Sequence, residues 1–257
     1  MKAVIIRFSS LGDVVLTSAT VEALNHAGAK IAFVTRPQYT PLFTEDPRIK
    51  RIIPLSTIGR VLSEIKDFKP DFIIDLHGTM RSLLVSFLSS GKTIRTKKHS
   101  LSRRILVKYG IGKKQPRSVV EDHRKAISKL GISMENIYPK LYPSQKGLSE
   151  AKKRLANIPK NELVIIHPYA RYPLKAWDRE KFQILAENFT KAGFNVIFIS
   201  DGINKPPIYY INKLTLEGLV GIISMGDIFI GNDSGPSHIA AALELAVVTI
   251  FGPSHPA

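Results

Sequence analysis

Three segments of the chain bring together residue types that serve acid–base chemistry and phosphate binding. The first spans residues 7–13 and holds two serines, one glycine and the carboxylate Asp13. It joins an apolar run to a helical pattern, and free backbone N–H groups at the start of a helix suit an anion. Asp13 itself fits two roles: the N-cap of that helix, or a catalytic carboxylate at the edge of a cleft.

The second segment, residues 231–241, is a turn rich in Asp, Ser, Gly, Pro and His between a buried strand and a helix. Ser234 and Gly235 would present backbone N–H groups at the positive end of the helix dipole, which predicts a site for a phosphate or diphosphate. Pro236 suits the first helical turn because it needs no N–H partner there. His238 is either a packed core histidine or part of this site.

The third segment, residues 167–177, begins at His167 and continues as a loop that carries two cations. Arg171 and Lys175 could neutralise a diphosphate leaving group, or they could be ordinary solvated charges. Trp177, the only tryptophan, is expected to staple the start of the following helix.

Several other classes of site are excluded by what the sequence lacks. It contains no G-x-G-x-x-G fingerprint, so a nicotinamide or flavin cofactor is not expected. It contains no H-E-x-x-H and no D-x-D carboxylate pair, so a dedicated metal site is not expected either. The absence of cysteine excludes disulfides and a thiol nucleophile. The sequence therefore predicts a site without cofactor or metal.

Basic residues outnumber acidic ones, 37 against 21, which gives a net charge of +16 and an isoelectric point near 10.0. The excess is concentrated in one stretch, called here the basic segment, from Gly91 to Lys125. It holds 12 Lys or Arg against Glu121 and Asp122, a net charge of +10. Its only aromatic residue is Tyr109, so single-stranded nucleic acid is not the expected partner. An anionic membrane surface fits better, and the alternative is a solvated loop.

The composition, 257 residues of which 44% are hydrophobic, is typical of a soluble globular protein and excludes a disordered chain or a helical membrane bundle. No apolar run has the length of a signal-peptide core or a membrane span. The expected location is the cytoplasm.

Short apolar runs alternate with helical periodicity in both halves of the chain, which predicts two doubly wound α/β domains with parallel sheets facing a cleft. The predicted strands are 3–8, 31–35, 52–53, 72–76, 163–167, 195–200, 227–231 and 247–251. The predicted helices are 13–27, 58–68, 119–130, 178–192, 216–224 and 235–243. We expect an N-terminal domain over residues 1–140, a linker over 141–160 and a C-terminal domain over 161–257. The chain ends just after a strand, so the covering helix that normally follows is expected to be missing.

The same motifs, taken in order, resemble a known family. The 7–13 turn, the His-Pro and Lys-Ala-Trp elements of 167–177, and the D-S-G-P-S-H-I-A-A turn followed by F-G-P-S are similar to those of lipopolysaccharide heptosyltransferases, glycosyltransferase family 9. The resemblance spans essentially the whole chain. It implies the GT-B fold, with two Rossmann-like domains, and inverting transfer of heptose from ADP-heptose to the lipopolysaccharide inner core.

The resemblance also implies roles for individual residues. Asp13 would be the general base, Lys175 the cation on the donor phosphates, Asp233 the contact to the donor sugar, and Ser234 with Gly235 the diphosphate-binding backbone. Beside these, the motifs themselves lead us to expect His167, Arg171, Pro236 and His238 on the donor side, and Ser10, Gly12 and His77 in the turns near the acceptor.

The acceptor implied is a phosphorylated glycolipid of the lipid A–Kdo type, which would place the protein peripherally on the inner face of the inner membrane. Domain closure would then align the acceptor oxygen with the anomeric carbon for direct displacement. Three alternatives stay open: a GT-B enzyme using another nucleotide-sugar, a nucleotide-sugar epimerase, or a non-catalytic module that binds nucleotide-sugar or nucleic acid.

Overall fold

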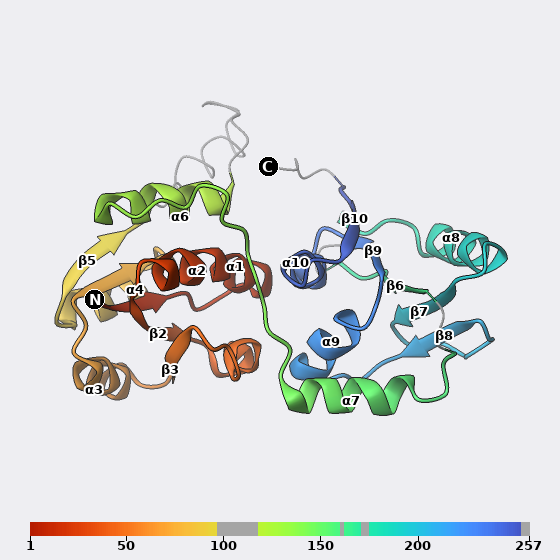
Figure 1. Ribbon diagram of the computed structural model, residues 1–257, viewed down its shortest axis with the longest axis horizontal. Helices are drawn as coiled ribbons and strands as arrows, with labels where there is room; N and C mark the ends of the chain where they lie inside the picture. Colours follow the sequence, from red (N-terminus) through yellow and green to blue (C-terminus); the bar gives the residue numbers. More distant parts are fainter. Residues whose placement is uncertain (97–117, 160–161, 171–174, 253–257) are drawn as a thin grey trace.

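The computed structural model describes residues 1–96, 118–159, 162–170 and 175–252, which form two α/β units side by side (Figure 1). Each unit is built on a five-stranded parallel sheet, one in the order β3-β2-β1-β4-β5 and the other in the order β10-β9-β6-β7-β8. The strands of the first sheet are β1 Lys2–Ile6, β2 Lys30–Thr35, β3 Ile49–Pro54, β4 Phe72–Asp75 and β5 Lys92–Arg95. Those of the second are β6 Leu163–His167, β7 Asn195–Ile199, β8 Ile208–Ile211, β9 Ile228–Asn232 and β10 Ala246–Ile250.

Both sheets are wound in the same way. The chain moves outward from the first strand, β1 or β6, through the next two, and then crosses to the other side of the first strand for the last two. This reversal leaves a crevice at the carboxyl ends of the two strands that flank it, which is where open α/β sheets bind ligands. The flanking pairs are β1 with β4 and β6 with β9.

Helices cover both faces of each sheet, which confirms the expected doubly wound architecture. They are α1 Leu11–Leu16, α2 Ser18–His26, α3 Ile58–Phe68, α4 Met80–Leu88, α6 Val119–Ile127, α7 Gln145–Leu155, α8 Arg179–Lys191, α9 Leu216–Ile223 and α10 Gly235–Ala242, with 3₁₀ turns η1 Pro37–Phe43 and η2 Ser128–Leu130. Helices α3 and α4 pack on the outer face of the first sheet, and α8 packs on the outer face of the second.

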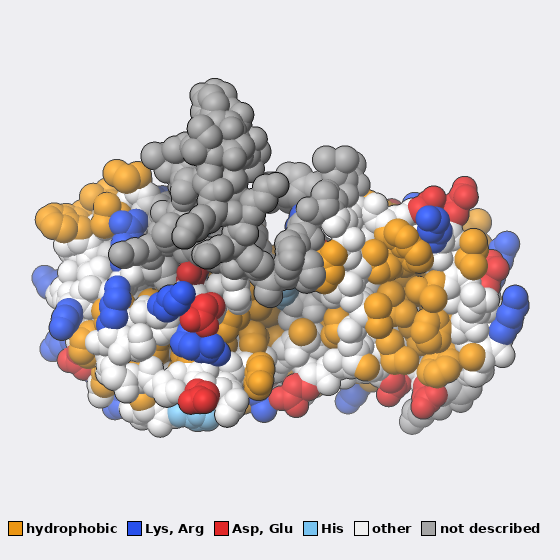
Figure 2. All heavy atoms as spheres, turned by 90° about the horizontal axis from the view of Figure 1, so that it is seen from above, with side chains coloured by type: hydrophobic (Ala, Val, Ile, Leu, Met, Phe, Trp, Pro, Cys, Tyr) orange, Lys and Arg blue, Asp and Glu red, His pale blue; other side chains and the backbone are white. Residues whose placement is uncertain are grey.

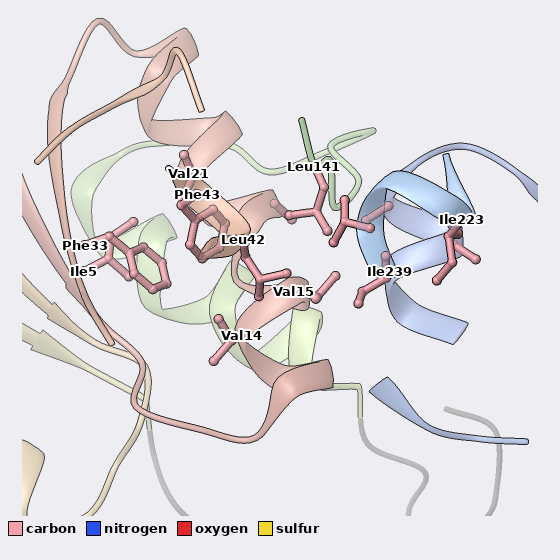
Figure 3. Close-up of a cluster of buried hydrophobic side chains, with 14 of the residues drawn as sticks. Ile5, Val14, Val15, Val21, Phe33, Leu42, Phe43, Leu141, Ile223 and Ile239 are labelled. Atoms are coloured by element: carbon pink, nitrogen blue, oxygen red, sulfur yellow. The ribbon is translucent and has the colours of Figure 1, made fainter. Parts of the chain in front are cut away.

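A single cluster of buried hydrophobic side chains lies between the two sheets and joins the units. It includes residues of α1 and α2 on one side and of α9 and α10 on the other. In Figure 3, Val15 of α1 points toward Ile239 of α10. The Leu141 N–H donates to the Ala242 carbonyl, so the connection between the units is itself tied to α10. The relative placement of the two crevices therefore rests on core packing.

Several elements differ from the sequence-based expectation. The helix expected over 13–27 is two helices that meet at Thr17, and the region expected to be a linker contains α7, which packs against α9. Helix α4 and the edge strands β5 and β8 were not expected. The helix expected over 119–130 is present as α6 followed by η2. Within the described ranges, no helix is long and apolar enough to cross a membrane.

Candidate active site

The sequence-predicted site residues follow the four strands that flank the two crevices. Residues 7–13 follow β1, His77 follows β4, His167 ends β6, and Asp233 follows β9. Because the carboxyl ends of neighbouring parallel strands meet at one edge of a sheet, each unit contributes one compact group of polar side chains.

Asp13 is the third residue of α1, and Ser10 is the N-cap of that helix. The Asp13 carboxylate accepts hydrogen bonds from the Ser10 N–H at 3.1 Å and from the Ser10 hydroxyl at 2.8 Å. It also forms an ion pair with Arg7 at 2.7 Å. The expectation that Asp13 could be the N-cap is therefore wrong in position, although its carboxylate does bind the cap residue in a capping-box arrangement.

The ionisation of Asp13 is controlled by these neighbours. Burial alone would raise the pKa of Asp13, but the Arg7 charge and the hydrogen bonds from Ser10 outweigh burial and hold that pKa below its ordinary value. Asp13 is therefore ionised at neutral pH and can accept a proton.

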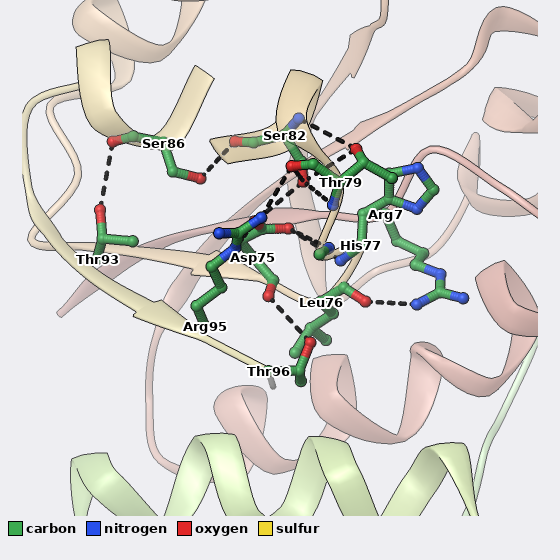
Figure 4. Close-up of polar contacts among 11 residues, drawn as sticks. Arg7, Asp75, Leu76, His77, Thr79, Ser82, Ser86, Thr93, Arg95 and Thr96 are labelled. Atoms are coloured by element: carbon green, nitrogen blue, oxygen red, sulfur yellow. Dashed lines mark hydrogen bonds and ion pairs between the residues drawn. The ribbon is translucent and has the colours of Figure 1, made fainter. Parts of the chain in front are cut away.

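Arg7 links Asp13 to the turn after β4. Its guanidinium pairs with Asp13 and also donates to the Leu76 carbonyl, a contact shown in Figure 4. The next residue in that turn, His77, packs its ring against Phe8 with centroids 4.8 Å apart. The two turns near the expected acceptor side thus lie against each other.

The turn after β4 is held by the buried carboxylate of Asp75. Its Oδ1 accepts from the backbone N–H groups of His77 and Gly78 at 2.9 and 3.0 Å. Its Oδ2 accepts from the Ser82 hydroxyl at 3.0 Å and from Arg95 at 2.7 Å (Figure 4). With all these donors satisfied, Asp75 fixes the path of the chain from β4 into α4.

Helix α6 places a further histidine behind Asp13. His123 is 1% exposed, and neither ring nitrogen has a hydrogen-bond partner among the described residues. Burial lowers the pKa of His123 to about 3; the Arg7 charge lowers it too and the Asp13 charge opposes the shift. His123 is therefore neutral at physiological pH.

In the second unit, the buried side chain of Asn232 anchors the loop that carries Lys175. Its amide donates to the Pro168 carbonyl at 2.8 Å, and its carbonyl oxygen accepts from the Trp177 N–H at 2.9 Å. Lys175 forms an ion pair with Asp233, the residue after Asn232. This ion pair holds Lys175 beside the end of β9.

Helix α10 begins directly after this ion pair. Ser234 is its N-cap, Gly235 its first residue and Pro236 its second. The Ser237 hydroxyl donates to the Asn232 carbonyl at 2.7 Å, which holds the start of the helix against the end of β9. The Ser234 hydroxyl is buried and has no partner among the described residues. The positive end of the helix dipole therefore lies beside Lys175.

The two groups meet where α1 packs against α10. A Cβ added to Gly12 would lie 2.5 Å from a ring carbon of His238, and one added to Gly235 would lie 2.5 Å from the Leu11 side chain. Burial lowers the pKa of His238; the charges of Asp233 and Asp13 oppose this shift, whereas Lys175 adds to it. His238 thus lies within electrostatic reach of groups from both units.

A cavity of about 440 Å³ opens next to this site in the second unit. Its lining includes His167, Tyr169, Asp201, Asn212, Thr215 and Leu219. Burial lowers the pKa of His167 to about 4, so this side chain is neutral at physiological pH. The cavity and the start of α10 lie at the ends of neighbouring strands, β6 and β9.

The structure thus brings Asp13, Gly12 and Ser10 together with His238 and the start of α10, and places Lys175 on Asp233. Arg171 lies outside the described residues. Sequence reasoning missed the contribution of Arg7, Asp75, Asn232 and His123. Asp75 and Asn232 each end a buried apolar strand, and that position was a signal that could have indicated them.

Three comparisons with known proteins point to one family. The family model described as glycosyltransferase family 9 (heptosyltransferase) matches residues 58–257. Lipopolysaccharide heptosyltransferase 3 of Escherichia coli is 26% identical over 94% of this chain and 80% of its own length.

Among solved structures, a family 9 glycosyltransferase from Veillonella parvula is similar with a TM-score of 0.83 and 22% identity, over 99% of this chain and 82% of that one. The E. coli heptosyltransferase WaaC with ADP-2-deoxy-2-fluoro heptose is similar with a TM-score of 0.71 and 21% identity, over 100% of this chain and 90% of that one. These likenesses confirm the expected GT-B fold. Because the family model covers more than half of the chain, the protein belongs to glycosyltransferase family 9, the heptosyltransferase family, and is a glycosyltransferase.

Proposed function

We propose that the protein transfers heptose from ADP-heptose to a hydroxyl group of the lipopolysaccharide inner core, with inversion at the anomeric carbon and without a metal ion. The observation that carries this proposal is the contact of α1 with α10, where Gly12 meets His238. This contact sets the ionised carboxylate Asp13 opposite a cationic helix start, as displacement of a diphosphate requires.

The donor would bind to the second unit. The cavity beside His167 has a volume suited to a nucleoside. Asp201, which follows β7 and lines this cavity, could accept hydrogen bonds from the ribose hydroxyls. From there the diphosphate would reach the start of α10 and Lys175. The WaaC structure was determined with an ADP-sugar, which supports this class of donor.

The acceptor would approach from the first unit. Asp13 would remove the proton from the attacking hydroxyl as the oxygen bonds to the anomeric carbon, and the bond from that carbon to the diphosphate oxygen would break. General-base help of this kind is worth about 10²–10⁴-fold in rate. Lys175 and the α10 dipole would stabilise the charge that develops on the leaving diphosphate, which is the role a metal ion plays in other transferases. Attack opposite the leaving group inverts the anomeric configuration.

The acceptor is proposed to be a phosphorylated glycolipid of the lipid A–Kdo type, with the protein docked peripherally on the cytoplasmic face of the inner membrane. The relative named lipopolysaccharide heptosyltransferase 3 supports a lipopolysaccharide acceptor. The net charge of +10 in the basic segment supports an anionic surface as partner. Most of that segment, residues 97–117, lies outside the described residues.

The test is transfer by the purified chain from ADP-heptose, in the presence of a chelator, to lipid A–Kdo acceptor, with the anomeric configuration of the product read by NMR. Parallel reactions with UDP- and GDP-sugars address the alternative that another nucleotide-sugar is the donor. Product formed only from UDP- or GDP-sugar, or only with added metal, would contradict the proposal. Binding of ADP-heptose without any turnover would support the non-catalytic alternative.

A further inference from the structure

Helix α4 has an unusual distribution of side chains. Its large hydrophobic residues face outward: Met80 is 80% exposed and Phe87 is 81% exposed, and Leu84 and Leu88 are also exposed. These four residues, called here the apolar face of α4, lie at spacings of four, three and one along the helix and so share one side of it.

The opposite side of α4 packs against the first sheet with small residues. Ser82 and Ser86 are buried, together with Val85. The Ser82 hydroxyl donates to Asp75 at 3.0 Å, and the Ser86 hydroxyl donates to the Ser82 carbonyl at 2.8 Å. An ordinary surface helix has the reverse arrangement, with hydrophobic residues inside and polar residues outside. A contiguous exposed group of large hydrophobic side chains marks a surface that another molecule covers.

The charges around the apolar face of α4 indicate which class of molecule covers it. No Asp or Glu occurs between Leu76 and Val120, a stretch that includes the whole of α4. Arg81 lies on α4 itself, and Lys92 follows four residues after its end; both are exposed. Figure 2 shows hydrophobic side chains at the outer end of the N-terminal unit with Lys and Arg side chains beside them. A second copy of a chain with net charge +16 would repel such a surface, whereas an anionic lipid bilayer would attract it.

The position of α4 relative to the site agrees with a lipid partner. The helix begins after Thr79, directly beyond the turn of His77 and Gly78 that Asp75 fixes. Arg7 connects the same turn to Asp13 through the Leu76 carbonyl. The start of α4 therefore lies beside the turn that borders Asp13, at the edge of the sheet where a membrane-bound acceptor sugar would approach.

We propose that the apolar face of α4 inserts into the surface of an anionic bilayer and orients the acceptor side of the enzyme toward it. The inference deepens the proposed function, because it rests on a lipid-linked acceptor. It adds an apolar contact to the electrostatic attraction expected of the basic segment. A helix with Met, Leu and Phe on one face and basic residues at its flanks has the composition of helices that lie in the membrane interface.

Because the protein has no native cysteine, a single introduced cysteine can carry a polarity-sensitive fluorophore in the first experiment. Phe87→Cys is compared with Ile203→Cys, a matched control in the second unit that is equally exposed at 81%. On addition of vesicles of phosphatidylglycerol and phosphatidylcholine, emission from position 87 should shift to the blue and emission from position 203 should not. No shift at 87 under conditions where the protein sediments with the vesicles, or no sedimentation at all, overturns the proposal. A blue shift at 87 that depends on protein concentration and not on lipid identifies a second copy as the occupant, and also overturns it.

The second experiment separates insertion from catalysis. The double variant Met80→Gln, Phe87→Gln should bind the same vesicles at least about tenfold more weakly than wild type, because two large apolar side chains no longer enter the bilayer. Its turnover with a delipidated core-oligosaccharide acceptor should equal that of wild type, while its KM for acceptor in vesicles should rise. Ile203→Gln should change neither quantity. If the wild-type protein shows no transfer to any acceptor, the proposed function is refuted, and the vesicle-binding results alone decide whether α4 inserts. Unchanged vesicle binding by the double variant would refute insertion alone.

Discussion

Replacing Asp13 with Asn should abolish most of the transfer activity and leave donor binding intact. The amide can still accept hydrogen bonds from Ser10, but it cannot take the proton of the acceptor hydroxyl. We expect kcat to fall by about 10²–10⁴-fold, which is the usual contribution of a general base. The dissociation constant for ADP-heptose should change little, because the proposed donor site lies in the second unit.

The same change also removes an ion pair, and its cost in stability must be separated from its effect on catalysis. The Asp13 side chain is 28% exposed and that of Arg7 is 13% exposed, so the pair lies between a surface salt bridge and a buried one. Loss of such a partner should lower the free energy of unfolding by about 1–3 kcal/mol. Arg7 keeps its bond to the Leu76 carbonyl, so the turn after β4 should stay in place.

Ser10→Ala is the matched control. It removes the hydroxyl that donates to Asp13 at 2.8 Å and should cost about 0.5–2 kcal/mol of stability, as loss of a helix cap does. The carboxylate itself stays, so the fall in kcat should be far smaller than in Asp13→Asn. Steady-state kinetics at saturating acceptor, calorimetry with ADP-heptose and denaturant unfolding measure the three quantities. Near-wild-type kcat in Asp13→Asn, or an equal loss in both variants, would show that Asp13 acts only as a structural residue.

Three further predictions concern charged residues, two in the candidate site and one set in the basic segment. Arg7→Gln removes the charge that lowers the pKa of Asp13, while burial still raises that pKa. The acidic limb of the kcat/KM profile should therefore move to higher pH. An unchanged limb would contradict the assignment of Asp13 as the base. Lys175→Ala should weaken ADP-heptose binding and slow turnover, and Arg171→Ala should have a smaller effect, because Lys175 is fixed on Asp233. Calorimetry and kinetics measure both effects. Equal small effects of the two variants would mean that the loop is only a solvated surface. The last prediction concerns four residues of the basic segment that lie outside the described residues: Lys97, Lys98, Arg103 and Arg104. Replacing all four with Glu should abolish binding to anionic vesicles and raise KM for the lipid acceptor, since each basic residue near such a surface contributes about 1 kcal/mol to binding. Co-sedimentation with vesicles that is insensitive to salt and to the four replacements would refute this prediction.

The sequence was informative where structure depends on local patterns. The central strands are apolar runs because both faces of a parallel sheet are covered, and residues 3–6 of β1 are fully buried. Trp177 packs edge-on against Phe182 with ring centroids 4.9 Å apart, one turn into α8, which confirms the predicted staple. The polar turns at strand ends could be recognised because each departs sharply from the apolar run before it.

The elements that were missed are those whose patterns depend on distant partners. Helix α7 was taken for part of a linker because the stretch that leads into it, up to Gly147, is rich in Gly and Pro. The structure shows that Gly147 is a contact residue: a Cβ there would lie 2.3 Å from the Glu217 carbonyl oxygen of α9. Helix α4 was also missed, although its large hydrophobic residues share one helical face; the sequence could not show that this face is the exposed one.

By itself, the sequence determined the class of fold, the turns that hold the polar residues and the family resemblance, since all of these are properties of short segments. Only the tertiary structure decided that Asp13 lies opposite the start of α10, that Arg7 joins it to the turn after β4, and that Asn232 holds the loop of Lys175. The physical reason is that these contacts join segments distant in the sequence, and Asp13 and α10 even come from opposite ends of the chain. They meet because Gly12 and Gly235 allow α1 and α10 to approach closely over a shared hydrophobic core.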